Sequence, residues 1–242
     1  MKENIKSVFW ITVFAICVVQ CSSDSPKLKI KKGTHLILIG NNLGSRMMNF
    51  GHFETELQLR YPDSLLFIRN MCDGGNTPGF RPHSGRRSPW AFPGAEKFQT
   101  ELANASGSEG HFETEDQWLT RLRADMMIAF FGYNESFQGG AGLDNFKAEL
   151  EAFILHTRNQ KYNGTRAPEL VLVSPIAFED LSDKFDLPNG KKENANLQLY
   201  TGAMKEVAIK NKVPFVDAYK PTSEWYESTK ESLTIDGQKM RF

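Results

Sequence analysis

The sequence has 242 residues, of which 40% are hydrophobic and 24% charged, and its 29 basic and 29 acidic residues balance to a formal net charge of zero. This length permits one sizeable hydrophobic core but hardly two domains. The balanced charge excludes a whole-chain attraction to nucleic acid or to an anionic membrane surface. We therefore expect a single globular domain without a nucleic-acid partner.

Residues 1–21 are similar to an export signal. Lys2 and Lys6 precede an apolar stretch, 8–19, that is too short to span a bilayer but suits a signal-peptide core. The stretch ends at Cys21, as in a bacterial lipoprotein signal, where the cysteine becomes the lipidated N-terminus. We expect cleavage before Cys21, export, and membrane attachment through this lipid alone. The alternative is an ordinary secretory signal with an incidental cysteine.

The remaining chain divides into a polar linker, 22–33, and a domain, 34–242. Cys17 lies in the signal core and Cys21 is the expected lipidation site, so Cys72 is the one cysteine left in the domain. An internal disulfide is therefore not expected, and stability must come from the core.

Within the domain, short apolar runs alternate with stretches of helical spacing. We predict strands at 34–39, 65–70, 125–131, 170–176 and 213–217, and helices at 46–59, 117–122, 143–157, 197–209 and around Trp225. This alternation favours an α/β fold, a parallel sheet of about five strands with helices on both faces. The irregular segment 78–110 interrupts the pattern, and loops of such length are usually functional or disordered.

Three of the predicted strands end in polar turns. These turns are Gly40–Ser45, Met71–Thr77 and Gly132–Ser136. In open α/β sheets, ligands collect at the carboxyl ends of the strands. We therefore expect the three turns to form a site.

In their order along the chain, these turns resemble the motif blocks of the SGNH, or GDSL-type, hydrolases. The Gly-Asp-Ser-Leu block is matched by Gly40–Leu43, the Ser-Gly-Asp-Thr block by Gly74–Thr77, the Gly-x-Asn-Asp block by Gly132–Glu135, and the Asp-x-x-His block by Asp236–Lys239. The resemblance runs from about Gly33 to the C-terminus. It implies a flavodoxin-like three-layer α/β/α fold, esterase or lipase activity, and no cofactor.

The resemblance also assigns roles to five positions. Asn42 stands at the nucleophile's position, Gly75 and Asn134 at those of the oxyanion donors, Asp236 at that of the orienting acid and Lys239 at that of the histidine. Acyl transfer by this route needs a hydroxyl and a base, together with donors for the oxyanion. Asn42 cannot attack as a hydroxyl does, and Lys239 is a base only if its pKa is lowered.

Other readings of these positions stay open. The two asparagines after the first strand could cap the following helix, and Gly75 could serve a turn that needs positive φ. Ser45 and Ser136 are candidate substitute nucleophiles. A family member would run past Phe242 into a closing helix, so a C-terminal truncation could account for the missing histidine.

Three arginines in the irregular segment, Arg81, Arg86 and Arg87, could hold a carboxylate or sulfate on a substrate. A solvated loop face is the alternative. No metal site is expected, because the histidines have no metal-ligand spacing: His35, His52, His83, His111 and His156.

Together these observations predict an exported hydrolase of ester bonds that acts on a small-molecule or carbohydrate ester, with acylated carbohydrate as a candidate substrate. The first alternative is a catalytically inactive protein of the same fold that binds a glycan or another small ligand. A lipoprotein scaffold without a ligand is the second.

Overall fold

The computed structural model describes residues 28–83, 85–102, 110–229, 234–235 and 238–239. The predicted signal peptide, its cleavage at Cys21 and most of the predicted linker lie outside the described residues. Within the described ranges, no helix has the length and apolarity needed to cross a bilayer.

A five-stranded parallel sheet forms the centre of the domain, in the order β2-β1-β3-β4-β5. Its strands are β1 (His35–Gly40), β2 (Phe67–Asn70), β3 (Met126–Phe130), β4 (Glu169–Val173) and β5 (Phe215–Val216). This confirms the predicted α/β fold class. Because β1 lies between β2 and β3, the turn that follows it lies between the turns that follow these two strands.

The side chains of β1 point alternately to the two faces of the sheet. Ile37 and Ile39 belong to the larger core cluster, whereas Leu36 and Leu38 belong to the smaller one on the other face. All four are almost completely buried. Burial on both faces explains why this strand is continuously apolar rather than alternating.

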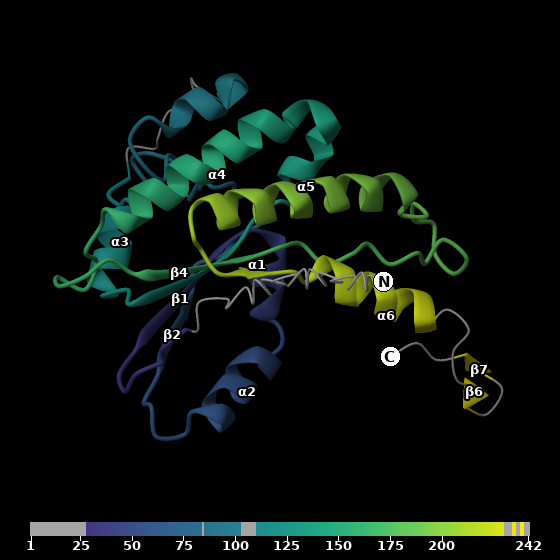
Figure 1. Cartoon of the computed structure of the whole chain (residues 1–242), viewed down its shortest axis with the longest axis horizontal. Helices are drawn as coiled ribbons and strands as arrows, with labels where there is room; N and C mark the ends of the chain where they lie inside the picture. The colour runs from purple at the N-terminus through teal and green to yellow at the C-terminus, as the bar shows by residue number, and fades with distance from the viewer. Residues whose placement is uncertain (1–27, 84, 103–109, 230–233, 236–237, 240–242) are drawn as a thin grey trace, which may run out of the picture.

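Helices cover both faces of the sheet (Figure 1). Helices α4 (Leu143–Arg158) and α5 (Lys191–Lys210) cover the larger core, and α1 (Asn42–Met47) and α2 (His52–Arg60) pack on the smaller core. Helices α3 (Glu115–Arg121) and α6 (Tyr219–Thr229) and the 3-10 segment η3 (Glu135–Gly142) complete the main body. The predicted three-layer α/β/α architecture is confirmed.

The helix predicted at 46–59 is two helices. α1 ends at Met47 and α2 begins at His52, with Gly51 as its N-cap residue. A glycine inside a helix costs about 1 kcal/mol relative to alanine, which favours a break here. By contrast, α5 is longer than predicted, because it begins at Lys191 rather than at residue 197.

The irregular segment after β2 folds against the body of the domain. It contains the short 3-10 helices η1 (Ala95–Phe98) and η2 (Thr100–Leu102), and η1 lies against α4. An isolated antiparallel bridge joins Phe80 to Trp90. In its described part, the segment is thus packed as part of the domain, and we refer to it below as the wall.

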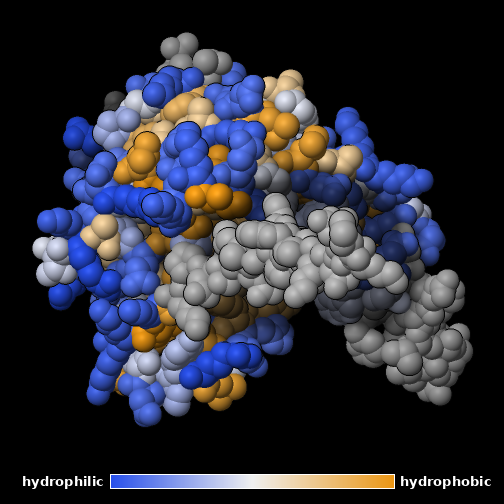
Figure 2. All heavy atoms as spheres, viewed as in Figure 1, coloured by the Kyte–Doolittle hydropathy of each residue, from blue (hydrophilic) through white to orange (hydrophobic). Residues whose placement is uncertain are grey.

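A small antiparallel hairpin, β6 (Thr234–Ile235) and β7 (Gln238–Lys239), follows α6. Figure 1 shows it beyond the end of α6, apart from the five-stranded sheet. Hydrophilic residues cover much of the face seen in Figure 2, with hydrophobic residues exposed between them. Such scattered apolar surface is ordinary in folded proteins.

Candidate active site

Hydrogen bonds join the three turns at the carboxyl ends of β1, β2 and β3. The Asn76 side chain donates from Nδ2 to the Gly40 carbonyl oxygen (3.1 Å), and the Asp73 amide donates to the same oxygen (3.0 Å). The Asn134 side chain donates from Nδ2 to the carbonyl oxygen of Asn76 (2.9 Å). The structure therefore brings together the three polar turns, as we expected from the sequence.

The first turn passes tightly against β3. Gly40 has φ +117°, and a Cβ atom at this position would lie 2.0 Å from the carbonyl oxygen of Phe130. The next amide, that of Asn41, donates to this same oxygen (2.9 Å). Only glycine fits here, and the close approach fixes where α1 starts.

Asn42 is the first residue of α1 and is partly exposed. A Cβ atom added to Gly74 would lie 3.3 Å from Asn42 Oδ1, so this side chain faces the turn after β2. Asn42 also borders a cavity of about 290 Å³, whose other lining residues are Leu43, Arg46, Tyr133, Pro175 and Ile176. The position predicted for the nucleophile therefore opens onto a hollow that could receive a ligand.

The two predicted oxyanion donors lie at this edge of the sheet. Gly75 is exposed with φ +86°, and its amide donates no hydrogen bond to a described residue. The amide of Asn134 uses one N–H on Asn76 and keeps a second. Both groups can donate to a carbonyl oxygen placed between the turns.

Glu135 is buried beside the first and third turns. Its Oε2 accepts from the Gly132 amide (2.9 Å) and from Asn41 Nδ2 (3.5 Å), while Oε1 is buried without a partner among the described residues. Burial raises the pKa of this carboxyl group to about 8. The side chain is therefore largely neutral at pH 7.

A second buried glutamate, Glu149 of α4, braces the segment that follows Asn76. Its Oε1 accepts from Thr77 Oγ1 (2.8 Å), from the Gly79 amide (2.9 Å) and from Gln99 Nε2 (3.2 Å). Burial raises the pKa of this group also. The turn after β2 is thus anchored to the helix layer.

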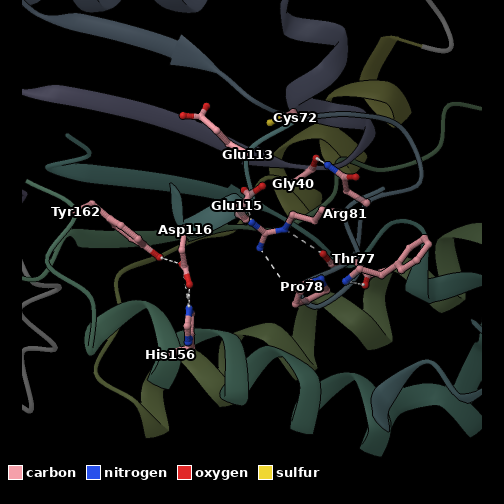
Figure 3. A network of polar contacts seen from close by, with 12 residues as sticks. Gly40, Cys72, Thr77, Pro78, Arg81, Glu113, Glu115, Asp116, His156 and Tyr162 are labelled. Carbon is pink, nitrogen blue, oxygen red and sulfur yellow. Dashed lines mark hydrogen bonds and ion pairs between the residues drawn. The ribbon is translucent and has the colours of Figure 1, made fainter. Parts of the chain in front are cut away.

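Arg81 and Arg86 are buried in the segment after β2. Figure 3 shows Arg81 beside Glu115. Arg81 Nη1 lies 2.7 Å from Glu115 Oε1, and Arg86 Nη1 lies 3.3 Å from Glu115 Oε2. Arg81 also donates to the carbonyl oxygens of Thr77 and Pro78. The solvated-loop alternative is therefore wrong for these two arginines, whereas Arg87 is exposed.

The two buried arginines line a cavity of about 250 Å³ next to the turn after β2. Its remaining walls are Met48, Asn70, Met71, Cys72, Asp73, Asn76, Pro82, His83, Glu115 and Trp118. Burial raises the pKa of the Cys72 thiol, so this cysteine is an inert wall residue. Arg87 does not line this cavity.

Figure 3 also shows a neighbouring polar group around Asp116 of α3. Asp116 accepts from the Tyr162 hydroxyl (2.7 Å), and His156 Nε2 lies 2.9 Å from its Oδ2. These contacts tie α3 to α4 and to the segment after it. Across the described ranges, no group of three or more His, Cys, Asp or Glu side chains could hold a metal ion.

Comparison with solved structures finds the same fold in esterases and in a GDSL-like lipase. A variant of Axe2, an acetyl-xylooligosaccharide esterase from Geobacillus stearothermophilus, matches with 16% identity over 83% of each chain and a TM-score of 0.52. A GDSL-like lipase from Parabacteroides merdae matches with 14% identity over 85% of each chain and a TM-score of 0.54. No family model and no curated protein matches the sequence.

The chain has the SGNH hydrolase fold. Its sheet and its helix layers correspond to the architecture that the resemblance implied, and the esterase and lipase structures named above share this fold.

Two of the predicted site positions, Asp236 and Lys239, belong to the fourth motif block. Asp236 lies outside the described residues, and Lys239 is in β7, in the hairpin that Figure 1 shows apart from the sheet. Cys21 also lies outside the described residues. Among the described site positions, the structure thus brings together Asn42, Gly75 and Asn134, whereas Lys239 belongs to the separate hairpin.

The candidate substitute nucleophiles differ in their surroundings. Ser45 is partly exposed in α1, one turn after Asn42. Ser136 is buried, and its hydroxyl donates to the carbonyl oxygen of Tyr133 (2.6 Å). Of the two, Ser45 has the freer hydroxyl.

Sequence reasoning missed the buried glutamates that hold these turns. Glu135 directly follows Asn134 in the matched third block, so its position was visible although its role was not. Glu149 lies between Phe146 and Phe153 on the apolar face of the predicted helix, and all three are buried. A charged residue on such a face was the available signal.

Proposed function

We propose that the protein hydrolyses ester bonds. The observation that carries this proposal is that two N–H donors, the Gly75 amide and Asn134 Nδ2, lie at the predicted oxyanion positions in a fold shared with esterases. Donors aimed at a developing oxyanion are usually the largest electrostatic contribution to acyl transfer. Ester hydrolysis is therefore the reaction that these residues support best.

The proposed substrate is an acylated carbohydrate outside the cytoplasm. Axe2, which has the same fold, acts on acetyl-xylooligosaccharides. The signal-like residues before Cys21 suggest export and a lipid anchor that would keep the protein at the membrane surface. The cavity beside Asn42, which can hold a small group, supports such a substrate.

The predicted site residues differ from the SGNH motif blocks at the nucleophile's position. Asn42 has no hydroxyl, so no acyl-enzyme forms there. In the proposed reaction a water oxygen adds to the polarised carbonyl carbon, the C–O bond to the alcohol breaks, and the water proton ends on the alcohol. Lys239 and Asp236 remain the proposed base and its partner on sequence grounds alone.

Turnover of p-nitrophenyl acetate and of acetylated xylo-oligosaccharides by the purified full chain tests this proposal. A serine-directed phosphonate applied in parallel separates the attacking groups. Turnover without labelling supports attack by water, and labelling that disappears in Ser45→Ala identifies that serine. If neither ester is hydrolysed faster than in buffer, the hydrolase proposal fails.

The second candidate is a protein that binds a ligand without hydrolysing it. Asn42 at the nucleophile's position favours this function. Arg81 and Arg86, which line the cavity beside Asp73, are then proposed to hold a carboxylate or sulfate on the ligand. Arg87 is proposed as a further ligand contact on sequence grounds alone. If the unmodified chain hydrolyses esters as fast as Asn42→Ser/Lys239→His, this candidate is excluded.

A further inference from the structure

One carboxylate oxygen connects the two turns that carry the candidate site. Oε2 of Glu135 accepts from the Gly132 amide (2.9 Å), in the turn after β3, and from Asn41 Nδ2 (3.5 Å), in the turn after β1. The side chain is 5% exposed. The contact is therefore shielded from solvent.

The two connected turns also carry Asn42 and Asn134. Asn41 directly precedes Asn42 at the start of α1, and its amide donates to the Phe130 carbonyl oxygen (2.9 Å). Glu135 directly follows Asn134. A change at Glu135 would therefore move both sides of the site relative to each other.

The surroundings of Glu135 disfavour its charged form. The titratable groups that interact with it are the carboxyl group of Glu149 on α4 and the phenol of Tyr200 on α5, and either would carry a negative charge when ionised. The Oε1 atom is buried with no partner among the described residues. Ionisation would thus place a charge where burial and one carboxylate oppose it.

We propose that Glu135 is a positioning residue whose hydrogen bonds to Gly132 and Asn41 set the separation of Asn42 and Asn134, without contact with the substrate. This inference rests on the proposed ester hydrolysis. A displacement of about 1 Å at a reacting group can reduce a rate by about 100-fold. The carboxyl group therefore controls turnover through the geometry of the turns.

Two substitutions separate positioning from simple filling of space. Glu135→Gln keeps a neutral acceptor for the Gly132 amide, whereas Glu135→Met fills a similar volume without one. We expect Glu135→Gln to keep p-nitrophenyl acetate turnover within about 3-fold of wild type at pH 7, and Glu135→Met to reduce kcat by at least about 10-fold with little change in KM. Equal kcat in wild type and Glu135→Met would overturn the proposal.

The pH profile of turnover distinguishes this role from a purely structural one, which would leave the profile unchanged. Wild-type turnover should fall as the pH rises above about 8, where Glu135 ionises, and Glu135→Gln should keep its turnover there. Thr201→Val, a change at a buried hydroxyl of α5 that makes no hydrogen bond to a described residue, is the control and should behave as wild type. An identical decline in wild type and Glu135→Gln would contradict the proposal.

Hydrogen exchange tests the same contact without any need for activity. The Gly132 amide should be protected in wild type and in Glu135→Gln and should exchange at least about 10-fold faster in Glu135→Met. If wild type shows this protection but no turnover, the hydrolase proposal fails while the structural role of Glu135 stands. If Glu135→Met retains full protection of Gly132, Glu135 does not hold this turn.

Discussion

Arg81 and Glu115 form an ion pair of 2.7 Å in which both side chains are at least 95% buried. The same carboxylate also lies 3.3 Å from Arg86, so one acidic group compensates two guanidinium groups. This arrangement fixes the segment after β2 as a wall beside the candidate site. Glu115 is thus the carboxylate that both buried arginines share.

Replacing Glu115 with glutamine should destabilise the protein strongly. Breaking a buried ion pair costs about 3–5 kcal/mol, because the remaining charge is left without compensation. The matched control is Glu113→Gln, whose partner Arg121 is exposed and which should cost no more than about 1 kcal/mol. Urea denaturation measures both free energies of unfolding, and similar losses in the two variants would show that the buried pair adds nothing.

Gly40→Ala should destabilise the protein far more than Gly164→Ala. Both glycines have positive φ, at +117° and +80°, so both substitutions carry the strain of a left-handed backbone, of about 1–2 kcal/mol. A Cβ at position 40 would also lie 2.0 Å from the Phe130 carbonyl oxygen, whereas position 164 has no atom within 4 Å. Thermal melting compares the two, and equal melting temperatures would mean that the turn is not held against β3.

The free energy of unfolding should decrease between about pH 4.5 and pH 8. Burial raises the pKa of Glu135 from 4.5 to about 8, so in this range the folded protein holds a proton that the unfolded chain has released. Stability is therefore fully present below the unfolded-state pKa and is lost as the pH rises through the folded-state value. The raised pKa of Glu149 adds to the same trend.

Urea denaturation from pH 5 to pH 9 checks this dependence. Glu135→Gln cannot ionise, so its stability should decrease less steeply than that of wild type across this range. Glu151→Gln is the control, because Glu151 is more exposed and its pKa is lowered by the hydrogen bond from Lys210. Parallel curves for wild type and Glu135→Gln would show that Glu135 is not neutral in the folded protein.

Asn42→Ser should create a serine that a serine-directed phosphonate can label. Position 42 opens onto a cavity and faces the turn that holds Gly75, so a hydroxyl there would lie beside the oxyanion donors. The substitution is at a partly exposed helix start and should change stability by no more than about 0.5 kcal/mol. Mass spectrometry of the labelled peptide locates the adduct, and a well-folded variant that stays unlabelled would contradict this geometry.

The sheet and the meeting of the three turns could be predicted because they depend on local patterns. A continuous apolar run such as Leu36–Ile39 predicts a strand buried on both faces, and parallel strands necessarily place the following turns along one edge. The roles of Asn42, Gly75 and Asn134 were assigned from the resemblance of these turns to the SGNH motif blocks and stay predictions. No long-range contact had to be known.

The supporting residues could not be predicted, because their roles arise from tertiary contacts. Arg81 is buried only because Glu115, 34 residues further along the chain, meets it. Glu149 likewise reaches Thr77 across 72 residues. Sequence spacing cannot distinguish such arginines from a solvated loop, since the partner is chosen by the fold.

The helix break at Gly51 is a feature that sequence periodicity did not predict. The apolar spacing continues from α1 into α2, so periodicity alone predicted one helix at 46–59. The structure ends α1 at Met47, and Leu43 and Met47 then pack on the smaller core together with Phe53 and Leu57 of α2. The packing of two short helices on this core is therefore more favourable than the single helix that the continuous apolar pattern predicted.

The rate of p-nitrophenyl acetate hydrolysis by wild type and by Asn134→Ala tests the proposed activity most directly. Removing one oxyanion donor reduces kcat by about 100-fold to 1,000-fold in hydrolases that use such donors. Asn145→Ala removes an exposed amide that donates to the Phe98 carbonyl oxygen (2.7 Å) and should leave the rate unchanged. We predict turnover in wild type and in Asn145→Ala and a loss of at least about 100-fold in Asn134→Ala. Equal rates in all three, or a wild-type rate no higher than that of buffer, would contradict the account.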